Sequence, residues 1–274
     1  MLATGAEFEG YVVDGVLGRG GHGVVYRAHP VAPRTGPAGV ALKVLETGER
    51  DPDRLALLQR EYQLAARLDH PHVVRMYASG PGWLAMELLT GGPVTGLPGP
   101  AERVAALAQI ADALDHAHRC GIVHCDVKPA NILLAAPGRP VRAVLIDFGV
   151  AHEVWEFVRT DGVEVSRRPV PVQASLPYTA PELLLGQAPS AASDQYALAC
   201  TLVEVLTGAP PFTGASQTEL MEAHLTQPPP QLSVRDDRLP RALDTAVGRA
   251  LAKEPELRHP DCAELLAQVS RALR

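Results

Sequence analysis

The stretch of sequence that decides the fold is Ile122–Asn131, which reads IVHCDVKPAN, followed closely by Ile146–Gly149, which reads IDFG. These two runs place one base, one lysine cation and two further oxygen-bearing side chains on two short loops. Transfer of a phosphoryl group from a metal-bound nucleotide needs this set of groups, because the protein supplies positioning and charge rather than covalent chemistry. The two strings therefore predict a phosphoryl-transfer site.

Each polar residue in the two runs has an expected role. We expect Asp126 to orient the acceptor hydroxyl and take its proton, and Lys128 to neutralise charge that develops on the transferred group. Asn131 and Asp147 would supply the hard oxygen ligands that magnesium prefers. A single acidic loop residue is more often a turn former. All four residues in this order form a much stronger signal.

Size and composition indicate an ordinary globular protein. The chain has 274 residues, of which 46% are hydrophobic and 20% charged, and its formal net charge is -6. A chain of this length can bury a full core. The acidic balance argues against nucleic acid or an anionic membrane surface as the main partner, because both reward a basic surface.

Cysteine usage and hydropathy predict a cytoplasmic location. The four cysteines lack paired spacing, so a disulfide framework or a zinc site is not expected; they are Cys120, Cys125, Cys200 and Cys262. No basic segment leads into an apolar run at the N-terminus, so no signal peptide is evident. The most apolar region, Tyr196–Leu206, contains Glu204 and is shorter than the roughly 20 residues that cross a bilayer. We therefore expect no membrane segment in this chain.

The hydrophobic pattern divides the chain into a small β-rich part and a larger α-rich part. Strands are expected at 11–17, 24–28, 40–45, 73–79 and 83–89, and a first helix at about 53–68. Helices are expected later at about 101–119, 192–207, 215–226, 240–252 and 260–273. The Gly- and Pro-rich segment 91–100 between the two parts is predicted to be a hinge without regular structure. Such a junction is a common place for a nucleotide.

A glycine-rich loop lies between the first two predicted strands. Residues 17–25 read LGRGGHGVV, with the spaced glycines at Gly18, Gly20 and Gly23. Glycines let backbone amides approach phosphates closely. Glycine-rich hairpins are common, so the motif alone is weak. A dinucleotide-binding fold would continue into a helix, whereas a strand follows here, which favours a flap over a nucleotide.

Lys43 and Glu61 are predicted to form an ion pair. Lys43 belongs to an apolar strand pattern, and the helical period places Leu57, Glu61, Leu64 and Leu68 on one face. A carboxylate within an apolar stripe is costly unless it is paired, and Lys43 is the available cation. The alternatives are a strand-edge lysine in solvent and a glutamate at a helix boundary facing water. The pair would hold the lysine against nucleotide phosphates.

From about Tyr11 to Arg271 the sequence resembles Hanks-type (eukaryotic-like) protein kinases, most of all bacterial serine/threonine kinases. Besides the catalytic run, Glu182 ends an Ala-Pro-Glu tripeptide that matches the close of the activation segment in that family. Asp194 matches the family's buried aspartate in the following helix, and Arg258 matches the late arginine that pairs with the glutamate. Lys128, two positions after the base, is typical of serine/threonine specificity.

The resemblance implies a bilobal α+β kinase fold in one domain, residues 1–274. A small β-rich N-lobe with one main helix would cover about 8–89, and a larger, mainly helical C-lobe about 90–274. It also implies ATP and Mg²⁺, with Mn²⁺ as an alternative metal, and protein substrates with serine or threonine acceptors. Self-association for autophosphorylation is left open.

The resemblance further implies which residues contact ATP, although core packing alone would also explain each of the apolar ones. Leu17, Val25, Ala41 and Leu133 would sandwich the adenine, Met86 would be the gatekeeper, and the backbone of Glu87 and Leu89 would bind the adenine edge. Ser175 takes the place of the hydroxyl residue that family members use near the base and the acceptor.

One departure from the family pattern concerns Cys125. The family usually has arginine before the catalytic aspartate, and that arginine pairs with a phosphate on the activation segment, which cysteine cannot do. Cys125 also raises the hypothesis of a redox switch beside the base, but we favour a buried structural thiol, because reactivity requires an accessible thiolate. The segment 163–172 has no clear assignment and is expected to be mobile.

Three functions are compatible with these residues. The leading one is an active protein serine/threonine kinase, because every expected catalytic residue is present. A catalytically weak pseudokinase that serves as a nucleotide-binding scaffold is the alternative. A small-molecule kinase is disfavoured by the Ala-Pro-Glu segment. The sequence names neither the physiological substrate nor the upstream signal, and it ends where a catalytic domain is expected to end.

The cysteine before the base generates a first prediction. Alanine at Thr160 or Ser166 should leave kinase activity unchanged, because Cys125 cannot read a phosphate on the segment between Asp147 and Glu182. Transfer from labelled ATP to a generic basic protein measures this. Loss of activity at either position, with recovery on acidic substitution, would contradict the prediction. Alanine at Ser175 is not diagnostic, because that residue has an expected place beside the base.

Overall fold

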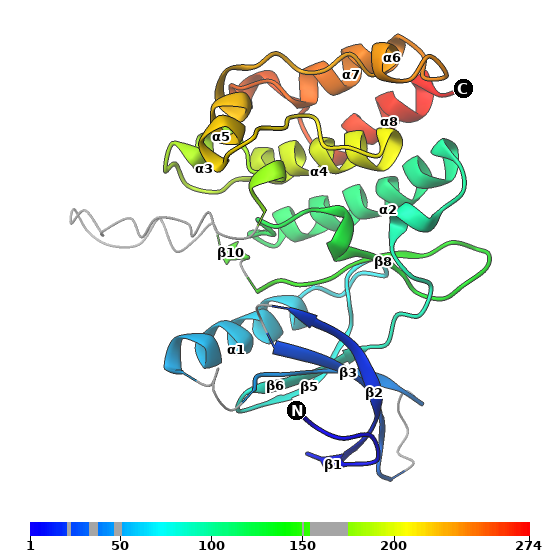
Figure 1. Cartoon of the computed structure of the whole chain (residues 1–274), viewed down its shortest axis with the longest axis vertical. Helices are drawn as coiled ribbons and strands as arrows, with labels where there is room; N and C mark the ends of the chain where they lie inside the picture. Colours follow the sequence, from blue (N-terminus) through cyan, green and yellow to red (C-terminus); the bar gives the residue numbers. More distant parts are fainter. Residues whose placement is uncertain (21–22, 33–37, 47–50, 150, 154–174) are drawn as a thin grey trace.

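The computed structural model describes residues 1–20, 23–32, 38–46, 51–149, 151–153 and 175–274, and Figure 1 shows them as a smaller lobe with a sheet and a larger helical lobe. The strands are β1 (Glu7–Phe8), β2 (Tyr11–Gly20), β3 (Gly23–Pro30), β4 (Val40–Val44), β5 (Met76–Gly80), β6 (Trp83–Glu87), β7 (Ile122–Val123), β8 (Ile132–Leu134), β9 (Ala143–Leu145) and β10 (His152–Glu153). The helices are α1 (Pro52–Ala66), α2 (Pro100–Arg119), α3 (Pro181–Leu184), α4 (Ala191–Thr207), α5 (Gln217–Thr226), α6 (Leu232–Arg235), α7 (Ala242–Ala250) and α8 (Cys262–Ala272).

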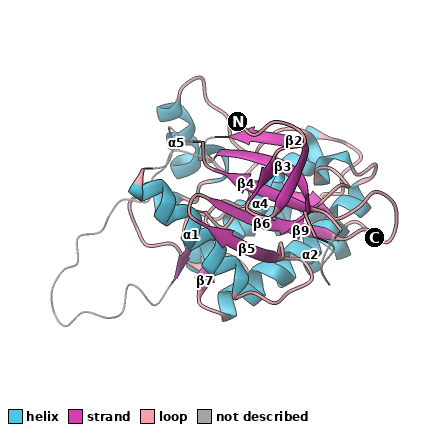
Figure 2. Ribbon diagram, turned by 90° about the horizontal axis from the view of Figure 1, so that it is seen from below, coloured by secondary structure: helices cyan, strands magenta, loops and turns pink. Residues whose placement is uncertain are grey.

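The small lobe is built on an antiparallel sheet of six strands in the order β1-β2-β3-β4-β6-β5. Figure 2 looks onto this lobe and shows the larger strands side by side. Strand β4 alternates as a buried strand should. Val40, Leu42 and Val44 pack into one apolar cluster, whereas Ala41 packs into a second cluster that includes Leu58 of α1. Alternation therefore sends Lys43 to the same face as Ala41.

Helix α1 packs against β5 and β6 and brings Glu61 toward the sheet. Its start is fixed by Asp51, whose side chain accepts a hydrogen bond from the backbone N–H of Arg54 at 3.0 Å. Glu61 lies on a buried face between Leu58 and Leu64. The sequence places Leu57 on that face as well, and this is wrong: Leu57 is 46% exposed. The apolar stripe passes through Leu58 instead.

The large lobe packs around α4, which is buried along most of its length. Helix α2 contacts both α4 and α8, and α7 contacts the same two helices. Gly208 ends α4 in the left-handed conformation, with φ 82°. Gly121, just after α2, is also left-handed, with φ 74°. Gly208 directly follows the helix predicted at 192–207, and Gly121 lies two residues after the helix predicted at 101–119.

Several boundaries differ from the sequence prediction because side chains fix them. Helices α5 and α8 begin two residues later than expected, since Ser216 and Asp261 accept hydrogen bonds from the backbone N–H groups of Glu219 and Glu264. The sequence predicts no regular structure over 91–100, and this prediction is wrong. The segment contains a 3-10 helix at Val94–Gly96. The short strands β7 to β10 are not apparent from the sequence.

Two stretches of backbone tie the small lobe to the large one. Leu145, at the end of β9, accepts a hydrogen bond from the N–H of Val74 at 3.0 Å and donates to the carbonyl of His72 at 2.8 Å. Residues 90–92 exchange three backbone hydrogen bonds with residues 134–135. The connection between the lobes is therefore held along its own length by the large lobe.

Among the helices that the structure describes, none combines the length and the apolar character that crossing a membrane would require.

The glycine that ends α4 generates a second prediction. Gly208→Ala should lower the free energy of unfolding by about 1 kcal/mol, because an L side chain at positive φ is strained although no atom lies within 4 Å of the added Cβ. Gly248→Ala in the middle of α7 is the matched control, with equally open space. It should be neutral or stabilise by up to about 1 kcal/mol. Urea unfolding measures both, and equal effects would contradict the assignment of the cap.

Candidate active site

The ammonium group of Lys43 is buried between carboxylates from two other segments. Its Nζ is 2.9 Å from Glu61 Oε1, 2.7 Å from Glu61 Oε2 and 3.4 Å from Asp147 Oδ1. Lys43 is 6% exposed and Glu61 3% exposed, so either charge alone would be costly. The ion pair expected from the sequence is therefore present. It joins β4, α1 and the segment after β9 at one point.

The charge state of Lys43 follows from this environment. Burial would lower the pKa of Lys43, but the carboxylates of Glu61 and Asp147 outweigh burial and raise its pKa. The amine therefore remains charged at neutral pH. A positive charge at this place can attract phosphate oxygens.

The backbone of the catalytic run is held by Asp194, a side chain with 0% exposure. Its Oδ2 accepts a hydrogen bond from the N–H of His124, and its Oδ1 accepts one from the N–H of Cys125, both at 2.8 Å. Cys125 has φ 66°, a left-handed conformation that is strained for a residue with a side chain. The two hydrogen bonds to Asp194 hold this turn in place and so fix the position of the next residue, Asp126.

The carboxylate of Asp126 lies within a network of hydrogen-bond donors. Its Oδ1 accepts a hydrogen bond from the Ser175 hydroxyl. Its Oδ2 accepts one from Asn131 Nδ2 at 2.8 Å and lies 2.7 Å from Lys128 Nζ. Lys128 Nζ also donates to Ser175 Oγ at 2.8 Å. The base candidate, the cation candidate and a hydroxyl thus lie in mutual contact, with the base candidate 6% exposed.

The Asp-Phe-Gly segment places one side chain inward and one toward Lys43. Phe148 is fully buried, and its ring meets the ring of His124 edge-on at 4.7 Å between centroids. Asp147 has φ 66°, and its side chain is 25% exposed. A Cβ on Gly149 would come within 3.2 Å of Asp147 Oδ1 and 3.4 Å of Glu61 Oε2. Glycine at position 149 therefore avoids a close contact with the carboxylates of Asp147 and Glu61.

The other residues expected to contact ATP lie in the small lobe and in the connection between the lobes, except Leu133, which lies on β8 of the large lobe. Ala41 and Met86 are buried, Val25, Leu133, Glu87 and Leu89 are half-buried, and Leu17 is 48% exposed. The side chain of Glu87 pairs with Arg142, and its N–H donates to the carbonyl of Arg75 at 2.8 Å. Their contacts with adenine stay predictions.

The glycine-rich loop joins two strands, β2 and β3, as the sequence predicts. Gly23 has φ 104°, and an added Cβ would lie 2.5 Å from the carbonyl oxygen of Val44, so only glycine fits. At Gly18 and Gly20 an added Cβ would meet nothing within 4 Å. Packing within the protein does not require glycine at those two positions. The expectation that they make room for phosphates stays a prediction.

Glu182 and Arg258 form a buried two-pronged ion pair behind the site. Arg258 Nη1 donates to Glu182 Oε1 at 2.8 Å, and Nη2 donates to Oε2 at 2.7 Å. Arg258 is 2% exposed and Glu182 is 4% exposed. The guanidinium also donates to the backbone carbonyls of Ala252, Ala192 and Lys253. This pair fixes α3 against the segment that precedes α8.

Two features differ from the sequence analysis. Cys125 is half-buried rather than buried, and its thiol lies 3.6 Å from the carbonyl of Val123. His118, which the sequence analysis did not select, donates from Nε2 to Asp194 Oδ2 at 2.8 Å. The available signal was a histidine in the last turn of a helix, which its negative end favours. Thr160, Ser166 and the segment 163–172 lie outside the described residues.

Comparison with known proteins gives a consistent result. Residues 11–269 match a family described as "Protein kinase domain". The chain is 37% identical over 286 aligned positions to serine/threonine-protein kinase PknJ of Mycobacterium tuberculosis, and 36% identical over 290 positions to PknF of the same organism. Each alignment covers 99% of this chain, but 47% of PknJ and 58% of PknF. The chain thus spans about half the length of these relatives.

A solved structure matches the whole fold. The crystal structure of the Mycobacterium tuberculosis PknI kinase domain superimposes with a TM-score of 0.73 at 32% sequence identity, and the match covers 99% of this chain and 100% of that one. The expected fold class, a β-rich small lobe and a helical large lobe, is confirmed.

The buried ion pair generates a third prediction. Glu182→Gln should lower the free energy of unfolding by about 3–5 kcal/mol, because it leaves the Arg258 guanidinium buried without its counter-charge. The double variant Glu182→Gln, Arg258→Met should lose less than the sum of the single variants. Urea unfolding of the four proteins measures the coupling.

The control is the exposed pair of Glu264 and Arg271, 3.2 Å apart and 39% and 56% exposed. Removing either partner there should change stability by less than about 1 kcal/mol. Additive losses at Glu182 and Arg258, equal to those at the exposed pair, would contradict the role of burial.

Proposed function

The chain belongs to the protein kinase family, and on that premise we propose that it transfers the γ-phosphate of ATP to serine or threonine hydroxyls of protein substrates. The relatives named serine/threonine-protein kinases support this proposal, since they match the chain over almost its whole length. The activity of the whole protein, its substrates and its partners, including self-association for autophosphorylation, belong to the proposal.

The observation that carries the proposal is the contact of a hydroxyl with both Asp126 and Lys128. The Ser175 hydroxyl donates to Asp126 Oδ1 while it accepts from Lys128 Nζ at 2.8 Å. An alcohol beside this carboxylate is therefore oriented with its proton toward the base and its oxygen toward a cation. An acceptor serine or threonine brought to the same carboxylate would lose its proton to Asp126 as the phosphorus–oxygen bond forms. Lys128 would then offset the negative charge on the transferred group.

Lys43 serves the other end of the transferred group in this proposal. Its charge is secured by Glu61 and Asp147, and its position at the junction of three segments is fixed. A lysine held in this way can bind phosphate oxygens without further rearrangement. The glycine-rich turn between β2 and β3 would cover the same phosphates with backbone amides.

The residues present fit a divalent metal ion by their chemistry. Asn131 and Asp147 offer hard oxygen atoms, which suit Mg²⁺ and also Mn²⁺. The amide nitrogen of Asn131 donates to the backbone carbonyl and to Oδ2 of Asp126, both at 2.8 Å, which leaves its oxygen as the atom suited to a cation. The metal, when bound, would neutralise the phosphates of ATP. Which metal the protein prefers belongs to the proposal.

The test compares phosphate transfer with nucleotide binding in the same preparations. Asp126→Asn should lower the rate of transfer from labelled ATP to a generic basic protein by about 100- to 10,000-fold, because it removes the base. The same variant should keep the thermal shift caused by ATP with Mg²⁺, because the lysine and the metal ligands remain. Phosphoamino-acid analysis of the product should give phosphoserine or phosphothreonine.

Controls separate the competing functions. Asp237→Asn changes an exposed carboxylate remote from the site and should leave transfer unchanged. Lys43→Met should reduce both transfer and the thermal shift. A wild-type protein that binds ATP with Mg²⁺ but never yields phosphoprotein would overturn the proposal in favour of the scaffolding alternative. Transfer that is unaffected by Asp126→Asn would remove the assigned base.

A further inference from the structure

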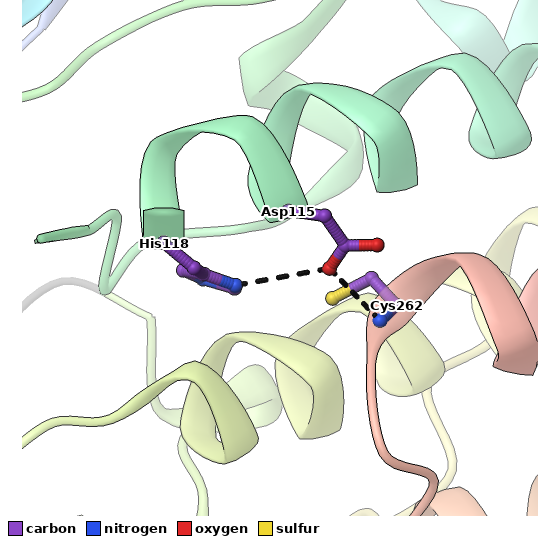
Figure 3. A group of neighbouring side chains, drawn as sticks. All are labelled: Asp115, His118 and Cys262. Atoms are coloured by element: carbon purple, nitrogen blue, oxygen red, sulfur yellow. Dashed lines mark hydrogen bonds and ion pairs between the residues drawn. The ribbon is translucent and has the colours of Figure 1, made fainter. Parts of the chain in front are cut away.

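A pocket of about 400 Å³ lies where the C-terminal end of α2 meets the N-terminal end of α8. Three side chains that can bind metal ions converge there, Asp115 and His118 from α2 and Cys262 from α8, as Figure 3 shows. One ligand atom from each lies within 4.8 Å of the other two, and among the described residues this is the one such cluster of histidine, cysteine and acidic side chains. None of the three belongs to the proposed catalytic machinery.

The spacing of the three donors suits a tetrahedral ion. Zinc bonds of about 2.0–2.3 Å place neighbouring ligand atoms roughly 3.3–3.7 Å apart in a tetrahedron. His118 Nδ1 is already 3.8 Å from Asp115 Oδ1. The side chains of Asp115 and His118 are only 12% and 11% exposed, and Cys262 is 1% exposed. Small side-chain movements would bring all three into range, and the pocket leaves room for a fourth ligand such as water.

The hydrogen bond made by the other ring nitrogen of His118 prepares it for metal binding. Nε2 is 2.8 Å from Asp194 Oδ2, and a carboxylate oxygen only accepts, so Nε2 carries the proton. In the neutral ring Nδ1 then presents a lone pair, and it faces Asp115. A histidine that donates one N–H to a carboxylate and offers its other nitrogen to a metal is a recurrent arrangement in metal sites.

A second, independent observation comes from His259 in the wall of the same pocket. Its Nε2 lies 3.0 Å from the carbonyl of Ala246 and therefore carries the proton. Its Nδ1 is buried without a hydrogen-bond partner, and the residue is only 5% exposed. An unpartnered lone pair is costly in a protein interior. His259 Nδ1 is not one of the three ligand atoms that lie within 4.8 Å of one another, so it is an unpartnered polar atom beside the cluster rather than a fourth ligand.

Asp115 also has a structural role, which explains only part of the cluster. Its two oxygens accept hydrogen bonds from the N–H groups of Cys262 and Ala263 at 3.0 and 2.9 Å, so it caps α8. Each carboxylate oxygen keeps a further lone pair that a cation can share. Asp115 also hydrogen-bonds with the Cys262 thiol, and burial together with this carboxylate raises the pKa of that thiol. These contacts do not account for the lone pair of His118 turned toward a carboxylate.

We propose that Asp115, His118 and Cys262 bind one zinc ion at the junction of α2 and α8. Sulfur and nitrogen donors select a borderline-soft ion such as zinc over magnesium or calcium. Binding forms a zinc–sulfur bond while the Cys262 thiol releases its proton to water. The ion would join two helices that are far apart in the sequence. Through His118 it would also stiffen Asp194, which holds the backbone of the catalytic run.

The experiment uses the reduced full chain, treated with chelator and then titrated with Co²⁺ or Zn²⁺ in excess Mg²⁺. Co²⁺ should produce one equivalent of a sulfur-to-cobalt charge-transfer absorption, and Zn²⁺ should abolish it. Zn²⁺ should raise the melting temperature, and elemental analysis should find one zinc per chain. Cys262→Ser should remove the absorption and weaken zinc binding by at least about 10- to 100-fold.

Cys120→Ser and Cys125→Ser are the matched controls, since both cysteines are also on or near α2 and the catalytic run but are half-buried. Both should keep the absorption. If Cys262→Ser itself unfolds more readily, the zinc-induced shift in melting temperature is compared instead of the absolute value. His118→Gln is the second variant, because glutamine can still donate to Asp194 but lacks the ring nitrogen, and it should also lose the shift.

Three results would overturn the proposal. The first is the absence of a charge-transfer band in the wild type, which would leave the cluster as a helix cap. The second is a band that survives Cys262→Ser but disappears in either control variant. The third is zinc binding that excess Mg²⁺ displaces, which would place the ion among the oxygen ligands of the catalytic site.

Discussion

The structure depends on one buried carboxylate, Asp194 of α4, which holds the loop that carries the base. Removing a carboxylate from water raises its pKa, but the hydrogen bond from the His118 side chain, the electrostatic interactions with His118 and His124, and the hydrogen bond from the backbone of His124 together outweigh burial and lower it. The charged form can therefore accept hydrogen bonds from two consecutive backbone amides. These two hydrogen bonds hold Cys125 in a left-handed conformation, and this conformation sets the direction of the Asp126 side chain.

A second constraint links this loop to the small lobe. Lys43 contacts Glu61 within its own lobe and Asp147 from the large lobe. Because all three charges are largely removed from water, moving α1 away from the sheet would leave a buried lysine with only one close carboxylate. The arrangement that suits phosphate binding is thus also the one that satisfies the charges. The ion pairs that keep Lys43 charged therefore also fix its position at the junction of the lobes.

The sequence predicted those features that depend on local pattern. The alternation of β4, the helical period that brings Glu61 inward and the glycine that ends α4 are all readable from short windows. Asp194 and the pair of Glu182 and Arg258 were found through the family resemblance alone, because their partners lie about 70 residues away. Features that depend on contacts between distant segments were missed, such as His118 beneath Asp194 and the pairing of 90–92 with β8. The burial of Leu58 in place of Leu57 shows that a helical period alone can be off by one residue.

The two backbone attachments between the lobes have a mechanical consequence. One lies where Leu145 meets His72 and Val74, and the other where 90–92 meet 134–135. If the small lobe rotates as a rigid body while both attachments stay intact, the rotation axis passes close to the line that joins the two attachments. In such a rotation each part of the small lobe moves in proportion to its distance from that line. Leu89 precedes the attachment at 90–92, so a small rotation of this kind would displace it little.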